Sequence, residues 1–570
     1  MLKRLTRLLS IALLASPLLA QDAPRPKAEP RVHKDREATA VDNAIIKEAR
    51  DNSQVMQTLD HLVNKIGPRL TGSEKLTKAQ EWATGMFKSF GIDNARMDEW
   101  GEFPVGFDRT ALEGRMVSPE EMKFELTTPS WTPGTNGPTK AHAVLAPTTK
   151  RELAELGDRL KGAWVVRRDV AQRRFGRNQD PESKPAAAEP ADKLAAEDLD
   201  IAYKAAGILG LVSPGFSPDL VLTGGNYRIT YDDLPKRTQV TIRRSQWERV
   251  VEILKEGKEV ELEFNLGNHF KKGPIKLYNV IADIPGTEFP NEYVIVGGHI
   301  DSWDGATGTT DNGTGVATTI EAARLLTKAG VKPRRTIRFM LWSGEEQGLL
   351  GSAAWTAKHK DLLDNVSAVL VHDGGTNYLS GINVTQAMVD TMDLATAPVR
   401  TLNAELPFTV NIVKQLPMGV GSDHDSFLPY NVPAFFWNQS GRANYTHTHH
   451  TQYDTYDAAI PEYQQHSSMV ISITAYALAM QDTKLPRPPA RKTLGATYGR
   501  DMIVSEVEKG GTAEKAGLKT GDKLLSIDGV EIADRRALRA AMESDAPTKK
   551  LTVERAGQKV ELVLKWEEKK

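Results

Sequence analysis

The sequence predicts a mixed α/β fold in which helices flank a mainly parallel sheet. Strand-like apolar runs recur between residues 277 and 375: "LYNVIADIPG", "YVIVGGH", "RTIRFMLWSG" and "VSAVLVHDGG". Between them lie segments with helical spacing of apolar residues, "GVATTIEAARLLTKAG" and "GLLGSAAWTAKHK". Strands that alternate with helices in this way build parallel sheets covered on both faces.

Composition is that of a soluble globular protein of several domains. The chain has 570 residues, 40% of them hydrophobic and 26% charged, and a net charge of -1. A balance so close to neutral does not favour a nucleic-acid partner, and we expect no membrane span. There is no cysteine, so any metal site must use His, Asp and Glu.

The first 20 residues are predicted to be a signal peptide. Lys3, Arg4 and Arg7 precede the apolar run 8–19, and Ala20 is a plausible cleavage position. Residues 21–40 form a polar, proline-containing tether. We therefore expect a periplasmic or secreted protein.

The rest of the chain divides into a main domain and two accessory modules. Segments 41–124 and 270–483 form the main domain, and 125–269 is a β-rich insert containing "KAHAVLAP" and "KGAWVVRR". Residues 484–492, "KLPRPPARK", are a linker, and 493–570 form a small separate unit.

Polar clusters follow the predicted strands where each of them ends. His299 and Asp301 follow "YVIVGG", and Glu345 and Glu346 follow "IRFMLWSG". Asp373 follows "AVLVH", "THTHHTQYDT" follows "NVPAFFW", and Asp311 opens "DNGTG" at a helix start. Each cluster alone has an ordinary structural explanation, such as a hydrogen-bonded histidine or a solvated helix start. Because strand ends converge on one rim, they would gather several carboxylates there, which requires a counter-charge.

The residue types favour a pair of divalent cations. Two histidines and three carboxylates without a thiolate suit two zinc ions about 3.5–4 Å apart, with one carboxylate bridging them. Adjacent Glu345 and Glu346 point in different directions, so that one can bind metal while the other contacts an activated water. The predicted reaction is hydrolysis of an amide. Cobalt or manganese could replace zinc in such a ligand set.

Several motifs resemble the zinc aminopeptidases of the M28 type in order and spacing. They are "IGPRLTGSEK", "GGHIDSW", "TDNGTGV", "WSGEEQGLLGS", "VLVHDGG", "GSDHDSF" and "HTQYDT". The resemblance covers residues 41–480 and implies a zinc exopeptidase fold. The whole plan, with its insert before the metal-binding segment, resembles the carboxypeptidase Q (plasma glutamate carboxypeptidase) branch of the family.

The resemblance also implies a role for each site residue. It makes Glu345 the general acid/base and Asp311 the ligand that bridges the two zincs, with a cis peptide bond at Asp311–Asn312. The other implied ligands are His299, Asp373, Glu346 and His450. His450 is preferred among His447, His449 and His450 because it lies four residues before Asp454, and His449 stays an alternative. Asp301 is expected to orient His299. Asp423 and His424 are expected either to support the site or contact substrate, or to have a structural role.

Both accessory modules resemble known domains. The insert is similar to the protease-associated domain of this family, which implies a wall of the cleft or a spacer without substrate contacts. The C-terminal unit, with "GGTAEKAGLKTGDKLLSIDGVEI", resembles a PDZ domain of bacterial proteases. That likeness implies binding of a peptide C-terminus at Leu494, Gly495 and Ala496, or a module that only orients the chain.

The predicted function is therefore an exported dinuclear zinc exopeptidase. It would remove N-terminal amino acids from short peptides, or cleave dipeptides, by means of metal-activated hydroxide. Alternatives are a zinc amidohydrolase of N-acyl amino acids and a receptor-like peptide-binding protein. The complete ligand set argues against the receptor, and two full metal sites argue against one-zinc cyclase chemistry.

Overall fold

A computed structural model describes residues 33–168, 192–217, 219–489, 492, 494–499, 501–542 and 546–566. The predicted signal peptide and residues 21–32 of the predicted tether lie outside these residues. Residues 33–39 of the tether pack on the main domain: the His33 ring lies 2.9 Å from Asp393 Oδ1, and Arg36 Nε donates to the Leu394 carbonyl. No helix in the described part of the chain combines the length and apolarity needed to cross a membrane.

The main domain is built on parallel strands in the order β14-β11-β9-β10, and β8 and β1 extend the sheet antiparallel. The bounds are β14 (Ala434–Phe436), β11 (Val366–Val371), β9 (Phe289–His299), β10 (Arg335–Trp342), β8 (Glu261–Ile284) and β1 (Arg96–Ser118). All eight residues of β10 are buried, because the sheet is covered on both faces. The predicted mixed α/β class is confirmed.

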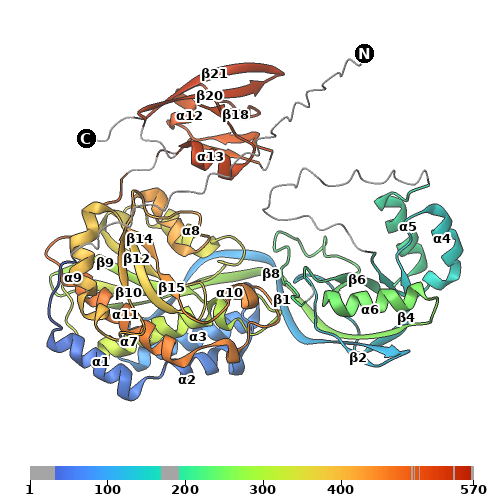
Figure 1. Cartoon of the computed structure of the whole chain (residues 1–570), viewed down its shortest axis with the longest axis horizontal. Coiled ribbons are helices and arrows are strands. Elements are labelled where there is room, and N and C mark those ends of the chain that lie inside the picture. Colours follow the sequence, from blue (N-terminus) through green and yellow to red (C-terminus); the bar gives the residue numbers. More distant parts are fainter. Residues whose placement is uncertain are drawn as a thin grey trace, which may run out of the picture.

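Helices cover both faces of this sheet (Figure 1). The helices are α1 (Ala40–Asn52), α2 (Val55–Asp60), α3 (Glu74–Ser89), α7 (Thr314–Lys328), α8 (Leu350–Lys358), α9 (Val389–Arg400) and α11 (Pro461–Ala479). In Figure 1, α1, α2 and α7 lie below the central strands and α8 lies above them. Beside the large sheet, β12 (Tyr378–Val384) pairs with β13 (Thr409–Ile412) and β15 (Asn438–Ser440).

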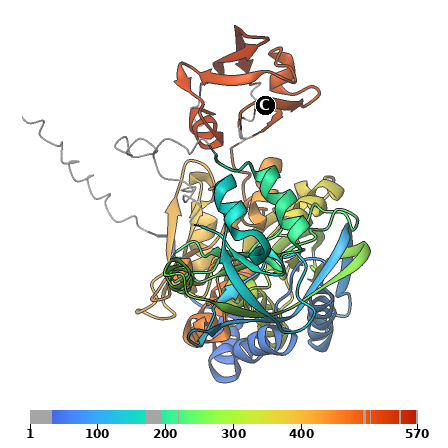
Figure 2. The ribbon, with the colours of Figure 1, turned by 90° about the vertical axis from the view of Figure 1, so that its right-hand side faces the viewer.

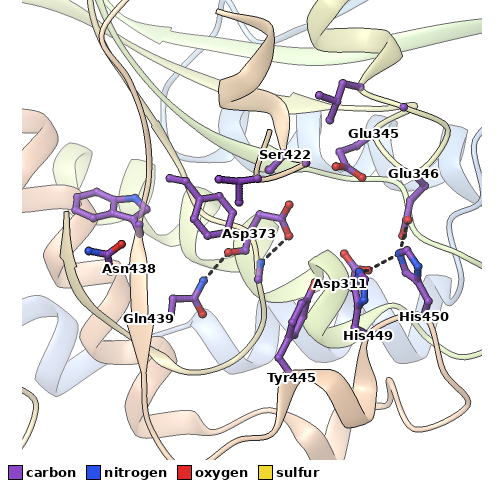
Figure 3. A pocket seen from close by; sticks show the side chains of 17 residues that line it. Asp311, Glu345, Glu346, Asp373, Ser422, Asn438, Gln439, Tyr445, His449 and His450 are labelled. Atoms are coloured by element: carbon purple, nitrogen blue, oxygen red, sulfur yellow. Dashed lines mark hydrogen bonds and ion pairs between the residues drawn. The ribbon is translucent and has the colours of Figure 1, made fainter. Parts of the chain in front are cut away.

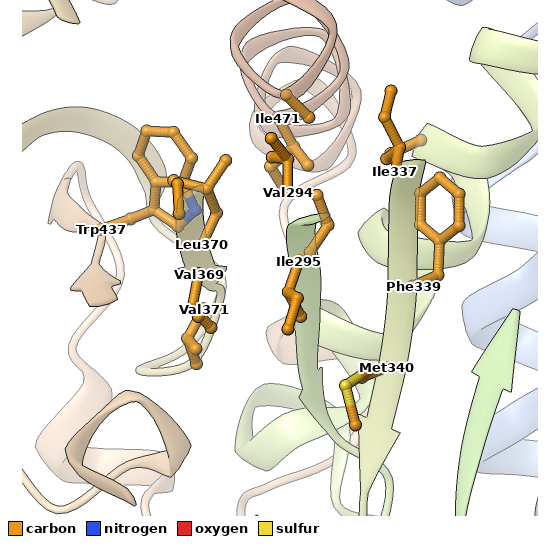
Figure 4. Close-up of a cluster of buried hydrophobic side chains, with 14 of the residues drawn as sticks. Val294, Ile295, Ile337, Phe339, Met340, Val369, Leu370, Val371, Trp437 and Ile471 are labelled. Atoms are coloured by element: carbon orange, nitrogen blue, oxygen red, sulfur yellow. The ribbon is translucent and has the colours of Figure 1, made fainter. Parts of the chain in front are cut away.

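The core forms where the central strands meet α11. Figure 4 shows Val294 and Ile295 of β9 between the side chains of β10 and β11, with Ile471 of α11 beside Val294. These side chains are almost wholly buried, as is nearly every residue of α11. A helix that is buried on nearly all sides, as α11 is, lies inside a large core, and the close packing fixes the carboxyl ends of the strands.

The insert continues the same sheet. Strands β4 (Thr139–Leu145), β5 (Trp164–Val166), β6 (Gly210–Pro214) and β7 (Thr238–Ile242) are parallel, and β3 (Leu126–Thr127) pairs antiparallel with β7. Besides the strands it contains α4 (Lys150–Leu156), α5 (Ala196–Ala206) and α6 (Arg244–Lys255). A long ribbon of β1 and β8 runs from the main domain into the insert, where β8 pairs with β4 and β1 with β2 (Met122–Lys123). The predicted insert boundaries stay a prediction.

The C-terminal unit has its own core and its own sheets, apart from the large one (Figures 1 and 2). Its elements are β16 (Ala496–Tyr498), β17 (Val504–Val507), α12 (Thr512–Lys515), β18 (Lys523–Ile527), β19 (Val530–Glu531), α13 (Arg535–Met542), β20 (Thr548–Arg555) and β21 (Gln558–Lys565). Leu494 is buried in this core, Gly495 has φ +70°, and Ala496 begins β16, which pairs with β17. Their role in peptide binding stays a prediction.

Candidate metal centre and active site

His299 ends β9 and is surrounded by carboxylates. Its side chain is fully buried, and its Nε2 lies 3.2 Å from Asp311 Oδ1, 3.5 Å from Asp373 Oδ1 and 3.9 Å from Glu345 Oε2. Within the described residues this nitrogen makes no hydrogen bond. A buried ring nitrogen that faces three carboxylates without a hydrogen bond fits a metal ligand.

Asp311 lies between His299 and the histidines of the 445–455 loop. Its Oδ2 makes no hydrogen bond within the described residues and lies 3.0 Å from His450 Nε2. The same His450 nitrogen is 2.9 Å from Glu346 Oε2 (Figure 3). Two groups with metal-ligand spacing therefore share Asp311: one is His299, Asp311 and Asp373, and the other is Asp311, His449 and His450.

The geometry favours His450 over His449 as a ligand. His449 Nε2 is 3.7 Å from Asp311 Oδ2, and its ring stacks on that of His450 with centroids 3.8 Å apart. His449 is also more exposed and makes no ion pair with Glu346 among the described residues. His447 points elsewhere and stacks on Tyr453.

The loop from Gly308 to Gly313 presents Asp311 through an irregular backbone. The predicted cis peptide at Asp311–Asn312 is confirmed. Asn312 Oδ1 accepts from the Gly315 N–H, and its amide donates to the His372 carbonyl. Asp454 accepts from the N–H groups of Thr310 and Asp311. These hydrogen bonds fix the backbone before and after Asp311, and so they restrict the position of its carboxylate.

Asp301 connects His299 to the two glutamates. His299 Nδ1 lies 3.1 Å from the Asp301 carbonyl oxygen and 3.6 Å from its Oδ1. The carboxylate also accepts from the Thr71 hydroxyl at 2.8 Å and from the N–H groups of Glu345 and Glu346 at 3.4 and 3.3 Å. These contacts fit the predicted orienting role, which stays a prediction.

The buried carboxylates of this cluster need a compensating positive charge. Burial raises the pKa of Glu345 well above its ordinary value, and burial together with Asp311 raises the pKa of Glu346 to about 7. Burial lowers the pKa of His450, but the Glu346 and Asp311 carboxylates outweigh burial and raise it to about 11. Carboxylates crowded in this way are destabilised unless a cation compensates them. The donor set, with nitrogen and oxygen ligands only, fits zinc.

A pocket of about 690 Å³ opens over the cluster (Figure 3). Asp311, Glu345, Glu346, Asp373, His449 and His450 line it, together with Leu349, Val420, Ser422, Phe436, Trp437, Asn438, Gln439 and Tyr445. The predicted residues Asp423 and His424 are buried next in sequence to the lining residue Ser422, and His424 packs against the lining residue Phe436. Burial raises the pKa of Asp423 to about 7.

Sequence reasoning missed Tyr445 and Trp303. Tyr445 begins α10 (Tyr445–Thr448) and lines the pocket beside Asp311 (Figure 3). Burial and the nearby carboxylates of Asp311 and Asp373 raise its pKa, so the phenol keeps its proton. The backbone N–H of Trp303 donates to Glu346 Oε1 at 3.2 Å, and the Trp303 ring meets the His450 ring edge-on. A signal for Tyr445 was its position within the histidine-rich stretch "NYTHTHH".

The fold and the site define a metallopeptidase. Residues 279–474 match the model of Peptidase family M28, and residues 484–555 match that of the PDZ domain. The chain thus contains an M28 peptidase domain followed by a PDZ domain.

Individual proteins are also similar to this chain. Carboxypeptidase Q of Bos taurus is 27% identical over 75% of this chain and 85% of its own length, and that of Homo sapiens is 26% identical over the same shares. A peptidase M28 precursor from Shewanella amazonensis has the same fold, with a TM-score of 0.55 and 24% identity over 79% of this chain and 98% of its own.

Proposed function

We propose that the chain is an exported zinc exopeptidase that removes N-terminal residues from short peptides, dipeptides included. The observation that carries this proposal is the shared carboxylate of Asp311, which joins two groups of metal-ligand spacing beneath a pocket lined by Glu345. The likeness to proteins named carboxypeptidase Q supports an exopeptidase.

We assign one zinc ion to each side of Asp311, with Glu346 in place of His449 in the second group. His299 and Asp373 would hold one ion, Glu346 and His450 the other, and Asp311 both. Zinc supplies a Lewis acid for the scissile carbonyl and makes water more acidic.

The residues of the chain itself have separate tasks in amide hydrolysis. Glu345 takes a proton from the attacking water and delivers it to the leaving amine as the C–N bond breaks. Tyr445 keeps its proton and donates a hydrogen bond to the carbonyl oxygen as that oxygen gains negative charge.

The test compares the zinc-loaded chain with its Glu345→Gln variant. Metal content is measured beside hydrolysis of Leu-p-nitroanilide, a dipeptide panel and the N-acetylated forms of the same substrates. We expect both proteins to bind about two zincs and the variant to lose 10²- to 10⁴-fold in kcat, a range typical of a general base. Hydrolysis of only the acetylated substrates would indicate the amidohydrolase, and binding without any hydrolysis the receptor-like protein.

Export and PDZ binding are further parts of the proposal. Export rests on the basic residues and apolar run of residues 1–20. A mature chain that starts at Gln21 in a periplasmic fraction would support export. A chain that retains Met1 in the cytoplasm would contradict it.

The PDZ domain is proposed to accept a peptide C-terminus beside β16, as such domains add a peptide strand to a sheet. Amidation of the peptide C-terminus should then abolish binding.

A further inference from the structure

One segment of the insert, residues 219–225, lies against the backbone of the proposed ligand His450. The N–H of Thr223 donates to the His450 carbonyl at 2.9 Å, and the Thr223 hydroxyl approaches the same oxygen at 3.4 Å. Leu222 and Thr451 form an antiparallel bridge beside this contact. Among the described residues, Thr223 alone donates hydrogen bonds to the His450 carbonyl.

His450 needs such support because its backbone is in the left-handed region, with φ +58°. A residue other than glycine is strained in that region, and such a conformation persists only where surrounding contacts hold it. The hydrogen bond from Thr223 is one such contact, and it comes from the insert rather than from the peptidase sheet.

Gln452 provides a second connection, two residues after His450. Its Oε1 accepts from the Val221 N–H at 2.9 Å, and its Nε2 donates to the Asp219 carbonyl and to Glu125 Oε2, each at 2.8 Å. Glu125 also accepts from the Tyr453 hydroxyl at 2.9 Å. The side chain of Gln452 is thus bound to the insert by both of its polar atoms.

Thr223 also packs against the loop between the proposed ligands His299 and Asp311. A Cβ at Gly305 would lie only 1.7 Å from Thr223 Cγ2, so that loop reaches Thr223 because residue 305 has no side chain. Next to it, the Ser130 hydroxyl donates to Asp304 Oδ1 at 2.7 Å, and Ser130 N–H donates to the Gly224 carbonyl. Residues 219–225 therefore touch two of the loops that carry proposed ligands, one before Asp311 and one at His450.

We infer that residues 219–225 of the insert position His450 for zinc, with Thr223 and Gln452 as the positioning residues, so that docking of the insert and binding at the His450 site stabilise each other. The inference rests on the proposed assignment of His450 as a ligand. Coupling between two sites is reciprocal, so zinc should protect the insert segment as much as the segment aids zinc. The His299 site depends on it less, because β9 holds that ligand directly.

The test measures the two zinc affinities of the metal-free full-length chain by competition with a chromogenic chelator. Removing an outer contact to a metal ligand typically costs 10- to 100-fold in metal affinity. We expect Gln452→Ala and Thr223→Pro each to lower the affinity for one zinc about tenfold and to leave the other unchanged. Glu155→Ala, at an exposed position of α4 in the same insert, serves as the matched control and should keep both affinities.

Hydrogen exchange supplies a second readout that needs no variant. Zinc should slow exchange at the N–H groups of Val221 and Thr223 in the wild-type chain. Unchanged exchange there, or wild-type affinity for both ions in Gln452→Ala and in a folded Thr223→Pro, would overturn the inference.

His450→Gln separates this inference from the proposed function. If His450→Gln loses one ion while Gln452→Ala keeps both, the positioning role is wrong and the metal assignment stands. If His450→Gln also keeps both ions at full affinity, the assignment of His450 as a ligand is itself wrong.

Discussion

The buried ion pair of Arg109 and Asp304 offers a sharp test of how the ligand loop is held. Arg109 is on β1 and Asp304 is in the loop after β9, and both side chains are 5% exposed. Arg109 Nε donates to Asp304 Oδ2 at 2.9 Å, and Nη2 reaches Oδ1 at 3.3 Å. The guanidinium also donates to Asn268 Oδ1 and to the Thr128 carbonyl, each at 2.9 Å. The perturbation is Arg109→Met.

The expected cost follows from what the substitution leaves behind. Methionine fills much of the volume, but the Asp304 carboxylate stays buried with only the Ser130 hydroxyl among the partners described above. Removing one partner of a buried ion pair costs about 3–5 kcal/mol, because an uncompensated charge remains. Replacing both partners by apolar residues, Arg109→Met with Asp304→Leu, should return most of that free energy of unfolding.

Urea unfolding followed by tryptophan fluorescence provides the assay. With an m-value of about 3 kcal/mol/M, the single variant should lower the midpoint by about 1–1.7 M. The control is Arg115→Met, which breaks exposed pairs with Glu121 and Glu263 and should change stability by less than about 1 kcal/mol. If Arg109→Met costs no more than Arg115→Met, or if the double variant is the less stable of the two, the reasoning from burial is refuted.

Three further predictions concern the site and the core. Tyr445→Phe should lower kcat about 10²-fold with zinc content unchanged, since it removes one donor to the developing oxyanion; an equal kcat would exclude that role. By zinc analysis, His450→Gln should lose one ion and His449→Gln should keep both, and the reverse result would identify His449 as the ligand. Burial lowers the pKa of His466 to about 4, so this histidine is neutral when folded and stability should fall as pH drops from about 6.5 toward 4. The free energy of unfolding, measured with urea across pH, should be about 2 kcal/mol lower at pH 5 than at neutral pH because of this group. His466→Asn should lack this decrease, and an unchanged pH profile in that variant would contradict the prediction.

Local patterns in the sequence were enough to predict the class of fold. The apolar-rich stretch "RTIRFMLW", which alternates with helical segments, predicted a strand in a sheet covered on both faces, and β10 is buried at every position. The same alternation placed His299, Glu345 and Asp373 at strand ends, where a parallel sheet brings ligands together. These conclusions needed only the order of residue types along the chain.

Contacts between distant segments could not be predicted in this way. The first part of the N-terminal tether that the structure describes, residues 33–39, is docked on α9 by His33 and Arg36, although its composition is that of a loose segment. The resemblance favoured His450 by its position before Asp454, but the physical ground for that preference comes only from the folded chain: His450 lies 3.0 Å from Asp311 Oδ2 and His449 3.7 Å.

By itself, therefore, the sequence determined the fold class, the ligand types and the chemistry they allow, because periodicity and residue type are local properties. Tertiary structure alone decided that Tyr445 reaches the pocket and that Thr223 of the insert lies against His450. Such a contact joins residues more than 200 positions apart, and its existence depends on how the sheet, the ribbon of β1 and β8, and the loops pack together. Packing of this kind is a property of the whole chain, which no short stretch of sequence specifies.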